Sequence, residues 1–460
     1  MPLQASVLST TWNRLPALLS QLRQSRLLRG SLVVGAGILA GNITGFFRVM
    51  VTAWFLGTHA RADALAVASG PIDTITNAII NSILLSFVPM LTVHKDSARA
   101  AIFHRARRVF VPLLLAVSGF IMLFAPALIT FLGPGLAREQ HDEAVVLLRL
   151  IAPSIFFGGT SSLCAALLYS ERRFLAPALY QACINGSMVL CALTLWPVFG
   201  VKGFAFGYTA GSALQWTLTW LASRDLRRID PSANSTPVAL REILRTPGIC
   251  LVYASLISCN VLATRAFATH GGPGMAAALD YCLRCLSVVI AYLVYPMSNS
   301  LMPEIARLRG AGDTAQAYRL MDRSIKLMAT ASVLGCLIGI AFRTPVIAIL
   351  FQRGSFTPES TRLVSTVFLG LAPAIIGWTL MDLVSRCFFA LNRPKIPMFA
   401  AFLPVSVNLV VIFLLGKGSS PALLGLGLSG GLAAGFLALF AAAHTSNKVG
   451  ELQVEPVEVA

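Results

Sequence analysis

The sequence has 460 residues, of which 56% are hydrophobic and only 12% are charged. A typical soluble domain carries about twice that charged fraction, so this chain lacks the polar side chains needed to cover a soluble fold of its length. The mean hydropathy of +0.75 agrees with this composition. The chain is therefore expected to be an all-α polytopic membrane protein, and a soluble globular protein is excluded.

The remaining charge is strongly basic, because 36 Lys and Arg stand against 19 Asp and Glu and give a net charge of +17. The basic residues cluster between apolar runs, as the positive-inside rule requires, so we expect no nucleic-acid partner. The nine cysteines lie almost entirely within apolar runs. Cys282 and Cys285 form a CxxC pair, but no second pair accompanies them, and no disulfide, metal site or cofactor is expected.

In chain order, residues 1–30 are expected to form a basic amphipathic lead-in on the cytoplasmic surface. An N-lobe is predicted over 31–223 and a C-lobe over 247–445, joined by a polar cytoplasmic linker over 224–246 and followed by a cytoplasmic tail over 446–460. Twelve apolar runs, six in each lobe, are long enough to cross a bilayer at about 20 residues: 31–57, 63–92, 109–133, 145–170, 175–198, 201–223, 247–270, 275–301, 325–351, 361–386, 395–416 and 421–445.

Basic residues occupy alternate loops between these runs. They gather in the segments 95–108, 172–173, 224–245, 307–326 and 393–395, whereas the intervening loops hold few of them. The positive-inside rule then places the basic loops and both termini in the cytoplasm. An even number of crossings agrees with this orientation.

The two lobes also resemble each other in sequence. Three pairs of positions match at an offset of 220 residues: Pro153 in LIAPSI with Pro373 in GLAPAI, Arg173 with Arg393, and Pro177 with Pro397. Six crossings return the chain to its starting side, so the two halves are expected to have the same orientation. Two six-helix lobes around a central cleft form the architecture of an alternating-access transporter.

No catalytic pattern stands out in the sequence. HExxH and Walker motifs are absent, and the predicted outer loops are too short to hold a catalytic domain. A transporter without covalent chemistry is therefore predicted, and an enzyme is not.

Two arginines interrupt the apolar runs. Arg48 lies in the first run and Arg284 in the eighth. An arginine that faces lipid costs about 2.5–3.5 kcal/mol on insertion scales, so both are expected to face a cleft between the lobes, with snorkelling to the interface as the alternative. Guanidinium groups match phosphate oxygens, which points to an anionic substrate. Arg149, Arg265 and Arg343 lie nearer the outer ends of their runs and are expected at the interface.

Few carboxylates fall inside the apolar runs. Asp73 and Asp382 are interpreted as the two that do so clearly, where they would carry a coupling ion or pair with arginines of the cleft. Asp63 begins the second run and is either a helix cap at the outer surface or a functional residue. Five amide side chains within the runs are expected mainly to join helices: Asn42, Asn185, Gln215, Asn260 and Asn408.

Several strings occur in a characteristic order: NITGFFRVMVTAWFLGTHARADALAVA, RFLAPALYQACINGSMVL, GFAFGYTAGSALQ, YCLR running to LMP, LFQRGSFTPEST and FFALNRPKIP. Over residues 31–416 the chain resembles the MviN/MurJ family of lipid II flippases, within the multidrug/oligosaccharidyl-lipid/polysaccharide exporter superfamily. The resemblance implies two six-helix lobes around a V-shaped cationic cavity. It also implies that Arg48, Asp63 and Arg284 belong to the substrate site.

The sequence departs from this family pattern at several positions. Asn42 stands where an arginine is usual and is kept in the predicted substrate site because of its place. Ile75 or Thr76 occupies the place of an arginine in the second helix, Leu283 replaces an Asp, and Ser287 replaces a Glu. Two further helices that commonly line a groove for the polyprenyl tail have no counterpart among the twelve runs.

The leading prediction is a monomeric flippase for an undecaprenyl-diphosphate-linked glycan in the bacterial inner membrane. Its partners would be this lipid, the surrounding membrane lipids and a coupling ion, Na⁺ or H⁺. The cargo is either a lipid II-like peptidoglycan precursor, which the resemblance favours, or an exopolysaccharide or O-antigen unit, which the missing arginines favour. The alternatives are a cation-coupled drug or metabolite exporter that uses Asp73 and Asp382, and a membrane scaffold that transports nothing.

Overall fold

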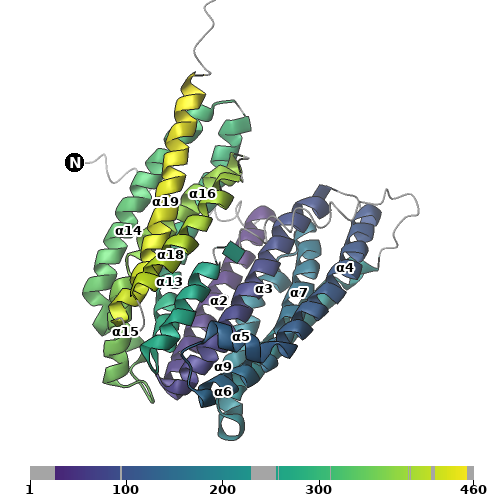
Figure 1. The fold of residues 1–460 in the computed structure, drawn as a ribbon. Coiled ribbons are helices and arrows are strands. Elements are labelled where there is room, and N and C mark those ends of the chain that lie inside the picture. The colour runs from purple at the N-terminus through teal and green to yellow at the C-terminus, as the bar shows by residue number, and fades with distance from the viewer. Residues whose placement is uncertain are drawn as a thin grey trace, which may run out of the picture.

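The computed structural model describes the chain in eight ranges: 26–93, 96–228, 255–256, 258–310, 312–391, 393, 395–415 and 420–452. All regular elements in these ranges are helices. Most of the predicted lead-in, linker and tail lies outside them. The predicted all-α membrane fold of two lobes is confirmed, and Figure 1 shows the two groups of helices meeting at one end and diverging toward the other.

The N-lobe contains nine helices, followed by the short α11 (Arg224–Arg227). Within it, α2 packs against α9, α3 against α7, and α10 against both α7 and α9. The helices are α2 (Arg26–Leu56), α3 (Ala60–Val93), α4 (Asp96–Leu123), α5 (Ala125–Leu132), α6 (Arg138–Ile151), α7 (Pro153–Ser170), α8 (Leu175–Ala178), α9 (Tyr180–Phe199) and α10 (Lys202–Ala222).

In the described part of the C-lobe, the first long helical stretch covers 258–268, and α19 packs against α15, α16 and α18. The lobes touch where α13 meets α2 and α3 and where α14 meets α2. The elements after 258–268 are the 3-10 helix η1 (Thr269–Gly271), α13 (Met275–Gly310), α14 (Thr314–Phe351), α15 (Pro358–Leu371), α16 (Ala374–Ala390), α17 (Lys395–Ala400), α18 (Phe402–Leu415) and α19 (Pro421–Leu452).

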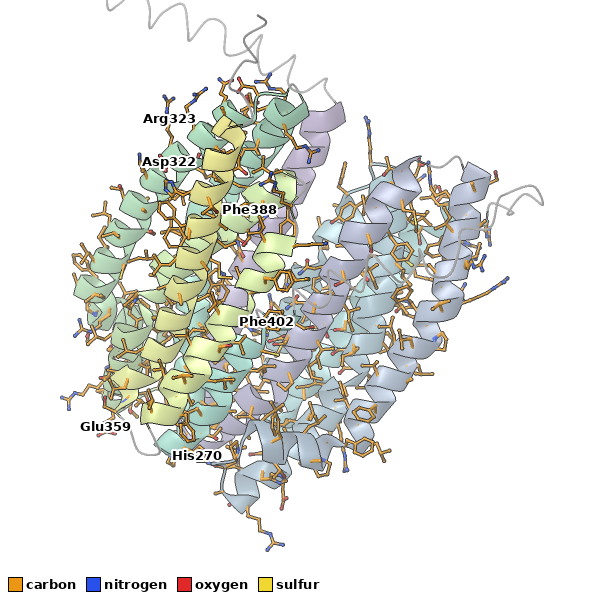
Figure 2. The ribbon with its side chains drawn as sticks, turned by 45° about the horizontal axis from the view of Figure 1, so that its top comes forward. His270, Asp322, Arg323, Glu359, Phe388 and Phe402 are labelled. Carbon is orange, nitrogen blue, oxygen red and sulfur yellow. The ribbon has the colours of Figure 1, made fainter. Side chains whose placement is uncertain are left out.

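Eight of the described helices or consecutive helix pairs are long and apolar enough to cross a membrane, and a ninth span results if α15 and α16 count as one bent crossing. Twelve crossings therefore remain a prediction. Helices α4, α13 and α14 run past their apolar segments into the basic ones. Figure 2 places Asp322 and Arg323 at one end of the C-lobe and His270 and Glu359 at the other, so basic and less charged segments lie at opposite ends.

The sequence repeat is also a repeat of structure. A helix break falls at Pro153, between α6 and α7, and another at Pro373, between α15 and α16, where the bend is 46°. Proline has no N–H for the helical hydrogen bond, so it favours such a break. After each second half-helix, the amide of Arg173 or of Arg393 donates to the carbonyl five residues earlier, at 2.9 Å in both lobes.

Small residues allow the membrane helices to pack closely. A Cβ on Gly207 would lie 2.6 Å from Met188 Cα, and one on Gly211 would lie 2.6 Å from Ile184 Cα. Only glycine fits at either position, so α9 and α10 pack backbone to backbone there. Because lipid provides no hydrophobic drive between helices, such close packing is a main source of stability.

Buried amides join helices, as predicted for most of them. Asn408 Nδ2 donates to Asn260 O at 3.0 Å and to Thr264 Oγ1 at 2.9 Å, which ties α18 to the 258–268 helix. Asn185 Nδ2 donates to Gly41 O at 3.3 Å and ties α9 to α2. Measured bonds of this kind between membrane helices are worth about 0.6–2 kcal/mol each.

The lobes are sealed against each other at the end predicted to face outward. We call the contacts between the lobes at this end the seal. Four of its hydrogen bonds join neutral groups: Ser355 N to Trp54 O at 2.9 Å, Tyr281 Oη to Gly57 O at 2.8 Å, Thr58 Oγ1 with Ser360 Oγ at 2.8 Å, and Gly135 N to Thr269 Oγ1 at 2.9 Å. A Cβ on Gly57 would lie 2.2 Å from Ser355 O, and one on Gly274 would lie 2.1 Å from Thr58 O. The seal therefore depends on close backbone contact.

Candidate functional site

A polar cavity of about 240 Å³ lies between the two lobes, on the inner side of the seal. We call it the polar cavity. The N-lobe contributes Arg48 from α2, Asp73 from α3 and Tyr208 from α10, and the C-lobe contributes Arg265 from the 258–268 helix with Asp280 and Arg284 from α13. Three arginines and two aspartates give its walls a formal net charge of +1.

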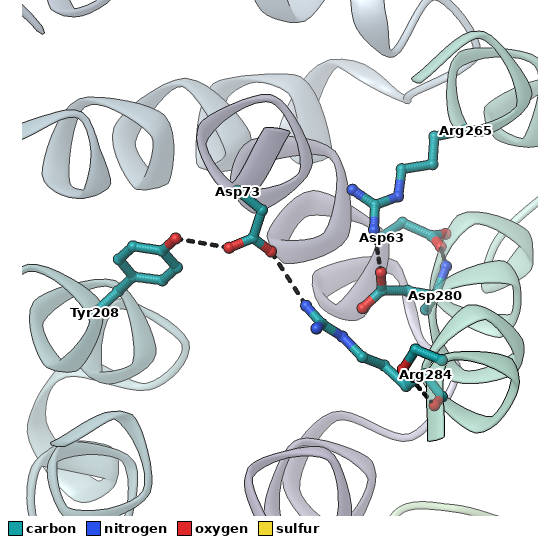
Figure 3. Close-up of polar contacts among 8 residues, drawn as sticks. Asp63, Asp73, Tyr208, Arg265, Asp280 and Arg284 are labelled. Carbon is teal, nitrogen blue, oxygen red and sulfur yellow. Dashed lines mark hydrogen bonds and ion pairs between the residues drawn. The ribbon is translucent and has the colours of Figure 1, made fainter. Parts of the chain in front are cut away.

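Arg284 reaches across the polar cavity to the other lobe. Its Nη2 lies 3.1 Å from Asp73 Oδ2, and Tyr208 Oη donates to Asp73 Oδ1 at 2.6 Å (Figure 3). Both members of the ion pair remain partly exposed, with 37% of the Arg284 side chain and 22% of the Asp73 side chain accessible. One oxygen of the Asp73 carboxylate thus contacts the N-lobe, at Tyr208, and the other contacts the C-lobe, at Arg284.

Arg265 and Asp280 form a second ion pair, which lies within the C-lobe. Arg265 Nη2 donates to Asp280 Oδ1 in Figure 3. The cation of this pair is more deeply placed than Arg284, since only 10% of the Arg265 side chain is accessible, while the two carboxylates are about equally exposed. A guanidinium this deep in a membrane protein needs a nearby carboxylate, because the charge would otherwise be unpaired in a medium of low dielectric constant.

Arg48 is the third arginine of the polar cavity, and it is buried on α2. Its Nη1 lies 3.4 Å from the sulfur of Met188, which is a weak acceptor. Among the described residues, no carboxylate lies within ion-pairing distance of it. The cavity therefore holds one cation whose charge no neighbouring side chain neutralises by direct contact.

A second cavity, of about 770 Å³, adjoins the polar one and is lined mainly by apolar side chains of α2, α13 and α14. We call it the apolar cavity. Gln181, Asn185 and Arg284 stand in the walls of both cavities. Asn42 lines the apolar cavity and not the polar one. The structure therefore separates Asn42 from Arg48, although both lie on α2.

Asp63 belongs to the seal rather than to the polar cavity. It lies in the first turn of α3, buried, and its carboxylate accepts from the amides of Gly274 at 2.5 Å and Ala277 at 2.8 Å (Figure 3). These amides open α13 of the other lobe, so Asp63 caps a helix across the interface. An anion is favoured there by the free N–H groups and the helix dipole.

Asp382 lies in neither cavity. Its Oδ2 accepts from Arg386 Nε at 2.7 Å, one turn later in α16. The structure thus brings Arg48, Asp73 and Arg284 together and leaves Asp63, Asn42 and Asp382 at three other places.

Two expectations from the sequence were wrong. Asp280 also lies inside a membrane helix, so Asp73 and Asp382 are not the only such carboxylates. Arg265 is buried against Asp280 and does not snorkel to the interface. Asp280 precedes Arg284 by one helical turn in LDYCLR, and that spacing was the available signal. Tyr208 was missed because nothing in its local sequence distinguishes it from a packing aromatic residue.

The sequence profile of the Lipid II flippase MurJ family matches residues 52–455. A curated relative described as a probable lipid II flippase MurJ, from Rhizobium meliloti (strain 1021), is 23% identical over 397 residues, which cover 82% of this chain and 72% of the relative. A lipid II flippase MurJ from Burkholderia cenocepacia is 22% identical over 430 residues, which cover 87% of this chain and 81% of the relative.

Solved structures share the fold. The lipid II flippase MurJ in an inward closed conformation aligns with a TM-score of 0.79 and 17% identity, covering 91% of this chain and 89% of that one. An inward-facing multidrug resistance MATE family transporter of the MOP superfamily aligns with a TM-score of 0.74 and 12% identity, covering 90% and 96%. Because the family profile spans most of the sequence, the chain belongs to the lipid II flippase MurJ family.

Proposed function

We propose that this protein is a flippase that moves a polyprenyl-diphosphate-linked glycan across the bacterial inner membrane by alternating access. The observation that carries the proposal is the pair of adjoining cavities, one polar and cationic, the other larger and apolar, with Arg284 in the wall of both. An amphiphile with an anionic head and a hydrocarbon tail matches this pair. The names of the relatives support the same class of cargo.

In this proposal the arginines bind the diphosphate. Arg48 comes from one lobe and Arg284 from the other, so a diphosphate between them would contact both lobes at once. Guanidinium groups donate paired hydrogen bonds to phosphate oxygens, and a lysine would supply charge without that geometry. No covalent step is required, because rocking of the lobes would expose the same cavity to the other side.

Transport in reconstituted vesicles tests the proposal. Arg48→Ala and Arg284→Ala are each expected to abolish flipping of a fluorescent polyprenyl-diphosphate glycan, and Arg→Lys at the same positions is expected to restore only part of it. Arg343→Ala is the matched control, because Arg343 lies in α14, lines neither cavity and donates to its own helix at Ile340 O. Normal flipping by both cavity alanine variants would remove the arginines from the mechanism.

The identity of the glycan follows from the charges that are missing. Asn42 and Ile75 provide no cation where the family usually has one, and each lost charge-assisted hydrogen bond removes about 1.5–3 kcal/mol of binding free energy. We therefore infer that this protein would replace a housekeeping lipid II flippase poorly. It would carry an exopolysaccharide or O-antigen unit better. Complementation of cells depleted of their lipid II flippase decides between the two, since full rescue at native expression would return the protein to the peptidoglycan pathway.

A cation-coupled exporter is supported less well. Its coupling acids would be Asp73 and Asp382, yet each is already paired with an arginine, Arg284 and Arg386 respectively. A scaffold without transport has no use for the cavity charges. If Asp→Asn at both positions abolished transport while both arginine variants kept it, the exporter would replace the flippase.

The proposed orientation places both termini and the 224–246 linker in the cytoplasm. Single cysteines in a cysteine-free background test it, and the linker position Ser235, which lies outside the described residues, is suitable. A cysteine at Ser235 is expected to react with a membrane-impermeant reagent only after the membrane is opened. Reaction in intact cells would invert the orientation.

A further inference from the structure

Asp73 is placed where a substrate anion would bind. Of the ion pairs between described residues, the one it forms with Arg284 is the only one that joins the two lobes. Its second oxygen is held by Tyr208 from its own lobe. The carboxylate therefore sits in the polar cavity as an anion fixed to the N-lobe, with its free face toward a C-lobe guanidinium.

A carboxylate and a phosphate make the same demand on a guanidinium group, since both present anionic oxygens that accept paired N–H bonds. Arg284 cannot give its full set of donors to Asp73 and to a diphosphate at the same time. Arg48 stands in the same cavity without a carboxylate partner. An entering diphosphate would meet one free cation and one that is already occupied.

The geometry points to Asp73 as an internal counter-anion that the diphosphate displaces from Arg284. This inference rests on the proposed function, because it specifies what happens at that site when the lipid binds. With the cavity empty, Asp73 neutralises Arg284 and ties the lobes together. When the diphosphate takes Arg284, Asp73 keeps its hydrogen bond from Tyr208, and the tie between the lobes passes from protein to substrate.

The second ion pair of the cavity shows why Asp73 and not Asp280 has this role. Arg265 and Asp280 both belong to the C-lobe, so exchanging their partners changes no contact between lobes. Arg265 is also largely inaccessible, whereas Arg284 keeps more than a third of its side chain exposed. A ligand can therefore compete for Arg284 at lower cost than for Arg265.

Displacement has a measurable consequence. If Asp73 competes with the diphosphate for Arg284, removing the Asp73 charge should strengthen diphosphate binding. Full-length protein in lipid nanodiscs is titrated with inorganic pyrophosphate and with geranyl diphosphate, and heat of binding is recorded. Asp73→Asn is expected to bind both about tenfold more tightly than the wild type. The Asp73→Asn/Arg284→Ala double variant is expected to bind no more tightly than Arg284→Ala alone, because Asp73 acts through Arg284.

Asp382→Asn is the matched control. It makes the same substitution, breaks the same kind of pair in a membrane helix and lies in neither cavity. It is expected to leave the affinity unchanged, and thermal unfolding of the empty proteins establishes that all variants are folded. Tyr208→Phe removes the hydrogen bond that the displaced Asp73 would keep, so it is expected to weaken diphosphate binding, opposite in sign to Asp73→Asn.

The outcomes separate this inference from the function beneath it. If the wild type binds pyrophosphate, Arg284→Ala loses it and Asp73→Asn binds no more tightly than wild type, Asp73 only orients Arg284 and the inference is wrong while the function stands. The inference is also wrong, with the function intact, if the gain persists in the double variant. If neither the wild type nor Asp73→Asn binds either diphosphate, both the inference and the proposed function fail.

Discussion

The seal and the polar cavity lie next to each other between the same two lobes, and they hold those lobes by different physics. The seal uses neutral hydrogen bonds and backbone contacts at glycine, with Asp63 as its one charged contributor among the described contacts. At the polar cavity, one ion pair between described residues, Asp73 with Arg284, joins the lobes, and the cavity leaves room around it. A neutral, close-packed interface can separate and re-form without moving charge through lipid, whereas a charged cavity suits an anion that comes and goes.

Removing Arg265 is expected to have the largest effect on stability. Asp280 would be left without its ion-pair partner, and breaking a pair whose cation is as deeply buried as Arg265 typically costs about 3–5 kcal/mol. Arg284→Ala should cost less, because Arg284 is much more exposed than Arg265 and Asp73 keeps its bond from Tyr208. Thermal unfolding and pyrophosphate binding of the two variants check this: Arg265→Ala should lose mainly stability, and Arg284→Ala mainly binding. The opposite pattern would mean that the more exposed pair supports the fold.

A methyl group in the seal is expected to have the next largest effect. Gly57 and Gly200 both have a positive φ, +52° and +54°, and alanine strains the backbone at each. At Gly57 the new Cβ would also lie 2.2 Å from Ser355 O, whereas at Gly200 no heavy atom lies within 4 Å. This overpacking should destabilise the conformation in which the seal is closed by about 1–3 kcal/mol, and it should not affect the open conformation.

The Gly57→Ala variant should therefore transport poorly and expose the cavity to the outside. Gly200→Ala is strained but meets no neighbouring atom, so it should leave the cavity closed. Ser69 lines a further small cavity between the lobes, together with Arg48 and Tyr281. A single cysteine at Ser69 reports opening of the seal by its reaction with a membrane-impermeant reagent. Equal labelling in the two variants would show that the seal does not need the close contact at Gly57.

Replacing Asp63 tests the charged part of the seal. An asparagine has one carbonyl oxygen where the carboxylate uses two, so one amide at the start of α13 loses its acceptor. The expected cost to the sealed state is about 1–2 kcal/mol. Labelling at Ser69 should rise in Asp63→Asn, but by less than in Gly57→Ala. A fall in transport with unchanged labelling would instead assign Asp63 to substrate binding.

The sequence was sufficient for the architecture because lipid restricts the possible folds. Only helices satisfy their own backbone in a bilayer, so apolar length predicts elements directly. The sequence repeat that matches Pro153 with Pro373 predicted two like halves; the helix breaks that fall at both prolines were not predicted. The insertion cost of a charge likewise predicted a cleft for Arg48 and Arg284, and both residues line the polar cavity.

The pairing within the cavity was not predictable in the same way. Insertion cost shows that an arginine must avoid lipid, but not which carboxylate it meets, because partners such as Asp73 and Arg284 lie 211 residues apart in the chain. Asp63 shows a related limit, since its position at a helix start suggested a cap for its own helix. It caps α13 of the opposite lobe, and only the tertiary arrangement reveals that.

The smallest effect is expected for an ion pair outside both regions. Arg173 and Asp225 form a bidentate pair at 3.0 and 2.6 Å, with the same chemistry as Arg265 and Asp280. About half of each side chain is exposed, and the hydrogen bonds from Arg173 lower the pKa of Asp225 below its usual value. Because water screens the pair, Asp225→Asn should cost less than about 1 kcal/mol at pH 7.

The pH dependence has a definite sign. A carboxyl whose pKa is lowered by folding stabilises the protein above its unfolded pKa of about 3.9, and this contribution is lost as the pH falls through the lowered value. Thermal unfolding of wild type and Asp225→Asn should therefore differ slightly at pH 7 and converge at the acid end. A loss at pH 7 as large as that of Arg265→Ala would contradict the comparison, since it would show that burial does not decide how much an ion pair stabilises the fold.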